Sequence, residues 1–169
     1  MSARLLLVML PVGWLILVLQ STLVSYITYA FPQPELLFII LAHHAIVRRD
    51  QDGLGLACAY GYLMDLFSGR ALGTHLFKYA VLMVVAQALG GRLLLQARFI
   101  QLLFVGALSL LGELLVLVAL YIGAASVPEL PTAQGLMSRV LANAVGTLFL
   151  FPLLQGLENA LFARRRLLL

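Results

Sequence analysis

Long apolar segments without charge, such as Leu5–Tyr29, most limit how this chain can fold. A soluble domain carries about 25% charged residues. This chain carries 11%, and 63% of its 169 residues are hydrophobic. So short a chain cannot hide that much apolar surface in one water-soluble core. The sequence therefore predicts an all-α polytopic membrane protein, most of whose surface faces lipid.

Charged or proline-containing breaks divide the chain into six predicted transmembrane helices. The clearest breaks are FPQP at Phe31–Pro34 and RRDQDG at Arg48–Gly53. Proline cannot continue the helical hydrogen-bond ladder, and charges are costly in hydrocarbon. The predicted helices are Arg4–Ala30, Glu35–Val47, Leu54–Phe67, Ala71–Gly91, Arg98–Gly123 and Gln134–Ala163. We expect them to form a single domain over residues 1–169.

The second and third predicted helices, Glu35–Val47 and Leu54–Phe67, are shorter than the roughly 20 residues that a crossing needs. A re-entrant hairpin would place the charged break between them inside the hydrocarbon. Each buried charge would cost about 3 kcal/mol on the insertion scale. Two short, complete crossings through a thinned or protein-lined region are therefore favoured.

Arginine placement predicts the orientation, because cytoplasmic ends are enriched in basic residues. If the N-terminus is cytoplasmic, Arg70 is the only basic residue in the predicted outer connections. Both termini are then cytoplasmic, and the net charge of +4 reflects topology rather than nucleic-acid binding. The cytoplasmic ends carry Arg4, Arg48, Arg49, Arg92, Arg98, Arg164, Arg165 and Arg166.

Small and polar residues recur at helical spacing on four of the predicted helices. On the third helix Gly53, Ala57, Gly61 and Asp65 are spaced by four, which forms one ridge that lets another helix approach closely. Three further stripes follow the same logic. They are Thr74, His75 and Lys78; Gly106, Ser109, Gly112 and Glu113; and Gly135, Ser138, Arg139, Ala142, Asn143 and Gly146.

Each stripe carries one charged side chain, and a charged side chain inside a membrane must face protein or water. We therefore predict a polar cluster of Asp65, Lys78, Glu113 and Arg139 in the outer half of the bundle. Asp65–Lys78 and Glu113–Arg139 are the expected pairs. Two interpretations remain open at this stage. The pairs either fix helix register, or they line a ligand cavity or partner-docking site.

Catalytic patterns are weak, so we expect no enzymatic activity and no cofactor. Ser68 and His75 share one short connection without a nucleophile-elbow pattern. Asp65 and Glu113 could form a carboxylate dyad, but each has a cation candidate nearby. The adjacent His43 and His44 point about 100° apart on a helix and do not suit one metal ion. The single cysteine, Cys58, has no metal-ligand spacing around it.

Two stretches resemble the MreD family of bacterial rod shape-determining proteins. They are PQPELLFIIL at Pro32–Leu41 and GLGLACAYGYLMDLFSGRALGTHLFKYA at Gly53–Ala80. The glycine-rich helix, the Asp-Leu-x-Ser-Gly-x-x-Leu-Gly pattern and the following polar helix start carry the likeness. The patterned positions are Asp65, Leu66, Ser68, Gly69, Leu72 and Gly73.

The resemblance implies a non-enzymatic scaffold of the cell-elongation machinery (elongasome) in the bacterial inner membrane. Such a scaffold would bind MreC, a bitopic protein with a periplasmic coiled coil, and help to organise lateral peptidoglycan synthesis and rod shape. Further implied partners are a RodA-type glycosyltransferase with its transpeptidase, the MreB filament and membrane lipids. The family fold is similar to the S components of energy-coupling vitamin transporters, so the alternative is a substrate-binding S component that docks on an ATPase module.

Overall fold

The computed structural model describes residues 3–24, 33–47, 52–68, 72–90, 97–123 and 132–166, which are helical apart from short connections. These helices match the six predicted segments, and the ends that can be compared differ by a few residues. The predicted ends at Ala30, Ala71 and Gly91 lie outside the described residues. The elements are α1 (Ala3–Leu19), η1 (Gln20–Val24), α3 (Leu36–Val47), α4 (Asp52–Ser68), α5 (Thr74–Gly90), α6 (Arg98–Gly123) and α7 (Ala133–Arg166).

The first helix departs from its predicted regular form at η1, which is a π-helical turn. Ser21 and Thr22 direct their hydroxyl groups back to the Val18 carbonyl, which competes with the regular helical ladder. The Gln20 side chain, at the start of the turn, instead reaches a segment that precedes α3. A helix that widens in this way can aim a polar side chain at a distant element.

The short helix α3 lies in the middle of the molecule. Its 12 residues rise only about 18 Å at 1.5 Å per residue, less than the roughly 30 Å of a bilayer core. Most of its side chains are buried, including the consecutive run from Leu41 to Ala45. Helices α1, α4, α5 and α7 all contact it. Because protein surrounds α3, lipid thickness does not set its length.

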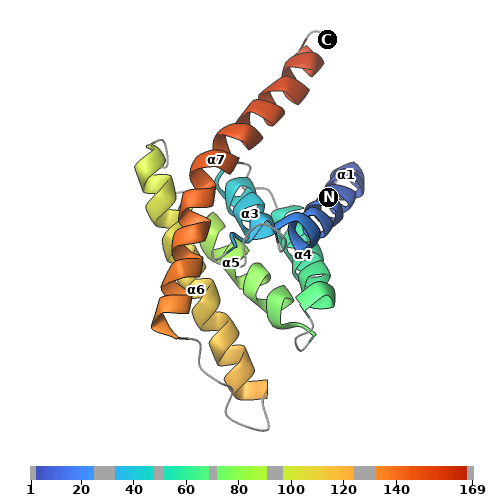
Figure 1. Cartoon of the computed structure of the whole chain (residues 1–169). Coiled ribbons are helices and arrows are strands. Elements are labelled where there is room, and N and C mark those ends of the chain that lie inside the picture. Colours follow the sequence, from blue (N-terminus) through green and yellow to red (C-terminus); the bar gives the residue numbers. More distant parts are fainter. Residues whose placement is uncertain are drawn as a thin grey trace.

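The other helices flank this centre on two sides (Figure 1). Helices α1 and α4 contact each other on one side, and α6 and α7 contact each other on the opposite side. Helix α5 connects the two groups, because it contacts α4, α3 and α6. Residues of α3 and α5 accordingly dominate the buried apolar core, with Ile39 and Tyr79 almost fully enclosed.

Helices α6 and α7 are, within the described residues, the two that are long and apolar enough to cross a membrane. They expose large apolar side chains such as Phe99, Ile122 and Phe149. Such surface is unfavourable in water and suits lipid. Helix α7 has 34 residues, about 51 Å by helical rise, and extends past the other helices in Figure 1.

The predicted small-residue ridge on α4 packs against α5. Gly53, Ala57 and Gly61 are all buried. At Gly61 an added Cβ would overlap the Leu76 Cα and lie 2.8 Å from the His75 carbonyl oxygen, so the two backbones touch. At Gly53 the nearest atoms belong to flexible side chains instead. At Gly61, therefore, the backbones of α4 and α5 are in direct contact.

We expect Gly61→Ala to destabilise the protein by about 1–3 kcal/mol, because the backbone of α5 must move away. Gly156→Ala on α7 is the matched control, because an added Cβ there meets no atom within 4 Å. The midpoint of thermal unfolding of the purified protein in detergent measures the effect. Equal midpoints for the two variants would contradict close backbone packing at Gly61.

Candidate functional site

Asp65, at the last turn of α4, accepts hydrogen bonds from backbone amides of the first turn of α5 and of Gly73, which directly precedes it. Its Oδ1 accepts from His75 N at 2.7 Å, and its Oδ2 accepts from Gly73 N at 2.8 Å and Leu76 N at 3.2 Å. These amides have no carbonyl partner within their own helix. A carboxylate also interacts favourably with the positive end of the helix dipole. Asp65 thus caps α5 from a different helix.

Gly73, which directly precedes α5, has the backbone conformation that this cap needs. Gly73 has a φ angle of 97°, in the left-handed region that favours glycine. Its carbonyl oxygen accepts a hydrogen bond from Phe77 N at 2.9 Å and starts the helix. Ser68 donates to the Asp65 carbonyl oxygen at 3.3 Å. The predicted motif residue Gly69 lies outside the described residues.

The predicted ion pair between Asp65 and Lys78 is wrong. The Lys78 ammonium donates instead to both carboxylate oxygens of Glu35, at 2.9 Å and 2.8 Å, and lies 3.5 Å from Glu113 Oε1. Asp65 is occupied by the backbone of α5. The prediction chose Asp65 because it lies close to Lys78 in the sequence. Glu35 precedes Lys78 by 43 residues, and only the tertiary structure brings the two together.

Glu35 is positioned by contacts to two other elements. Its backbone N–H donates to Asn143 Oδ1 of α7 at 2.7 Å. The Gln20 amide of η1 donates to the Pro34 carbonyl oxygen at 2.9 Å and accepts from Leu36 N at 3.4 Å. These amide side chains satisfy the start of α3 and hold the Glu35 carboxylate toward α5. Sequence analysis assigned no site role to Glu35 or Gln20.

Asn143 also ties α7 to α6. Its Nδ2 donates to Ser109 Oγ at 2.8 Å, and both residues are buried. Beside it, an added Cβ at Gly146 would lie 2.9 Å from Ile39 Cδ1 and 3.2 Å from Pro34 Cβ. The small-and-polar stripe of α7 therefore packs against both α6 and the start of α3. A polar residue among small residues in an apolar helix was the sequence signal for this contact.

The predicted pair of Glu113 and Arg139 is confirmed, with Arg139 Nη1 3.5 Å from Glu113 Oε2. Together with Lys78 and Glu35 they form a network that we call the ion cluster. The Lys78 side chain is 2% exposed and that of Glu113 is 7% exposed, whereas that of Arg139 is 48% exposed. Two acidic and two basic groups balance, as buried charges must.

A polar cavity of about 420 Å³ adjoins the ion cluster. This volume is within the roughly 300–1,000 Å³ of small-molecule sites. The lining of such sites is usually apolar, but here Met64 and Val116 are the two apolar residues among the described ones that line it. The four residues of the ion cluster complete the lining together with Gln20, Gln33, Ser68 and His75.

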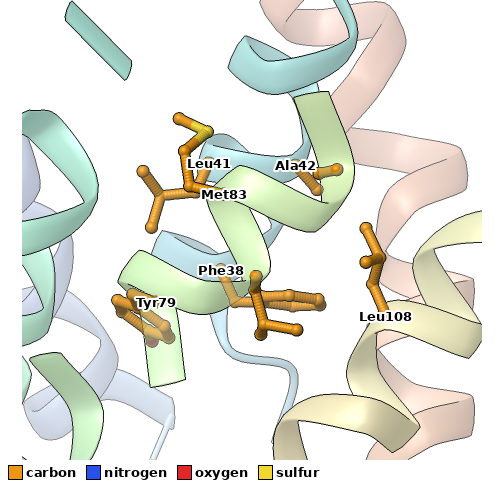
Figure 2. Close-up of a pocket in the computed structure, with 8 residues that line it drawn as sticks. Phe38, Leu41, Ala42, Tyr79, Met83 and Leu108 are labelled. Carbon is orange, nitrogen blue, oxygen red and sulfur yellow. The ribbon is translucent and has the colours of Figure 1, made fainter. Parts of the chain in front are cut away.

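A second, apolar gap lies between α3, α5 and α6 (Figure 2). Phe38, Leu41, Tyr79, Met83 and Leu108 are among the residues that line it. It measures about 10 Å³, close to the smallest space that holds one water molecule. This gap is a packing defect of the core rather than a binding site.

Metal binding finds no support within the described residues, where no group of three or more His, Cys, Asp or Glu side chains could hold an ion. The histidines His43 and His44 are buried in α3. The His43 ring packs edge-on against Phe151 of α7, with 5.0 Å between the ring centroids. At least His43 therefore contributes to helix packing.

The fold and the site define a helical, membrane-associated protein with a charge-balanced and largely buried ion cluster. The chain belongs to the MreD family, because the family model described as rod shape-determining protein MreD matches residues 1–159. This membership places it in rod shape determination, in a family not known for catalysis. No curated protein and no solved structure matched the chain.

Asp65→Asn should destabilise the protein by about 1–3 kcal/mol, because an amide offers one acceptor oxygen where the carboxylate serves three backbone donors. Asp52→Asn, at the first residue of α4, changes the same chemical group and should cost less than about 1 kcal/mol. Denaturant unfolding in detergent micelles compares them. A loss for Asp65→Asn no larger than for Asp52→Asn would refute the capping role.

Lys78→Met should destabilise the protein by about 3–5 kcal/mol, because the largely buried carboxylate of Glu35 then loses its cation and that of Glu113 loses one of two. Adding Glu35→Gln to the same chain should recover part of this loss. Membrane yield and the thermal unfolding midpoint of both single variants and the double variant test this coupling. Purely additive losses would show that Lys78 and Glu35 do not depend on each other.

Proposed function

We propose that this chain is a non-catalytic scaffold of the cell-elongation machinery in the bacterial inner membrane. In this role it binds an MreC-like bitopic protein and helps to organise lateral peptidoglycan synthesis. The family match over residues 1–159 carries the proposal. The motif at Asp65, Ser68 and Gly73 adds support, because it builds the α4–α5 turn.

The packing supports a bracing role. A scaffold must hold its binding surfaces in fixed positions, and buried ion pairs tolerate few alternative helix registers. Lys78 contacts acids that precede α3 and lie on α6, while Asn143 connects α7 to both. The outer faces of α6 and α7 expose apolar side chains that suit a partner's single transmembrane helix.

The proposed topology has six crossings, with both termini in the cytoplasm. The arginine distribution supports this orientation. The polar cavity then opens on the outer side, beside the turn between α4 and α5. Helices α3, α4 and α5 would be the short crossings of this bundle, with α3 in its centre.

One observation favours a second candidate function. The polar cavity of about 420 Å³ has the size of a small-molecule site, as the substrate-binding S component of a vitamin transporter would need. Its charged lining, and the scarcity of aromatic groups among the described residues that line it, argue for a small polar ligand instead. The scaffold therefore remains the preferred function.

Affinity purification from native membranes in mild detergent tests the proposal. We expect the tagged chain to recover a bitopic coiled-coil protein together with wall synthases, and its depletion to make rod-shaped cells round. An unrelated inner-membrane protein with the same tag and matched yield is the control. Recovery of an ATPase pair with a transmembrane coupling subunit, and unchanged cell shape, would favour the transporter.

A further inference from the structure

The polar cavity contains binding capacity that the ion cluster does not use. Lys78 and Glu35 satisfy each other at 2.8–2.9 Å, and Tyr79 adds a hydroxyl group 3.3 Å from Glu35 Oε2. Glu113 is held more loosely, with its two oxygens 3.5 Å from Lys78 and 3.5 Å from Arg139. The carboxylate of Glu113 can therefore accept a further donor.

Arg139 is the other group with spare capacity. Its guanidinium has five N–H donors in a planar fork, and its described ion pair is the single contact from Nη1. About half of its side chain is exposed, and it lines the cavity. A planar fork of this kind binds carboxylate or phosphate oxygens through two parallel hydrogen bonds.

The charges of the cavity select among ligand classes. A simple anion on Arg139 would lie close to the carboxylate of Glu113, and a simple cation on Glu113 would lie close to Lys78 and Arg139. Like charges at such distances repel. An apolar ligand would leave the polar lining without hydrogen bonds. A group that carries both charges avoids all three penalties.

We propose that the cavity binds a small zwitterion, with its anionic oxygens on Arg139 and its ammonium on Glu113. Two sources share this chemistry: the headgroup of phosphatidylethanolamine, or a free aminated phosphate or amino acid. The cavity, at about 420 Å³, has room for either. The proposal goes beyond the scaffold function and does not depend on which proteins the chain binds.

The test uses the purified full chain in detergent and measures its thermal unfolding midpoint. The probes are phosphatidylethanolamine, phosphatidylglycerol, a cationic lipid, phosphoethanolamine, inorganic phosphate and ethylamine. We expect stabilisation by a zwitterionic probe and not by the probes of a single charge. A rise with the lipid alone identifies a headgroup site, and a rise with soluble phosphoethanolamine identifies a site for a free ligand.

Arg139→Gln should weaken binding of the zwitterionic probe at least tenfold, measured by titration with native mass spectrometry. Arg98→Gln is the matched control, because Arg98 begins α6 and does not line this cavity. Equal stabilisation by single-charge probes, equal binding by both variants, or stabilisation only on addition of a partner protein would overturn the proposal. The comparison of probes uses the unmodified chain, so it stands even if Arg139→Gln does not fold.

Discussion

The buried ammonium of Lys78 is the constraint on which the rest of the structure depends. With a side chain 2% exposed, it cannot rely on water for solvation. It needs carboxylates within hydrogen-bonding distance, and the two that it has come from different elements. Any arrangement that moves α5 away from α6 or from the start of α3 leaves an uncompensated charge. The central packing is therefore specified by charge as well as by shape.

Several weaker interactions place Lys78 where this pairing is possible. Gly61 allows α5 to touch α4, and Asp65 caps the first turn of α5, one turn before Lys78. On the other side, Gln20 and Asn143 hold the segment that carries Glu35. The side chains of Asp65, Gln20 and Asn143 each satisfy backbone groups at a helix end, which in a membrane have no water to bind. Capping and ion pairing thus depend on the same geometry.

The same arrangement creates a cavity beside a rigid core. The Lys78–Glu35 pair is tight, whereas the Glu113–Arg139 pair is longer and partly exposed. This difference is compatible with a scaffold that braces its partners. The tight Lys78–Glu35 pair preserves the fold, and the partly exposed Glu113–Arg139 pair is accessible to a ligand. Membership of the MreD family connects this fold with rod shape determination.

Sequence alone determined the helical, membrane-associated class, the comparable helix boundaries to within a few residues, the buried ridge of α4 and the Glu113–Arg139 pair. These follow from apolar runs, proline and the cost of intramembrane charge, all of which act locally or through helical spacing. Only the tertiary structure decided that Asp65 caps α5 and that Lys78 pairs with Glu35. Helical spacing shows which residues share a face, but it does not show which distant segment that face meets. Glu35 and Gln20 acquire their roles only when η1, the start of α3 and α5 come together.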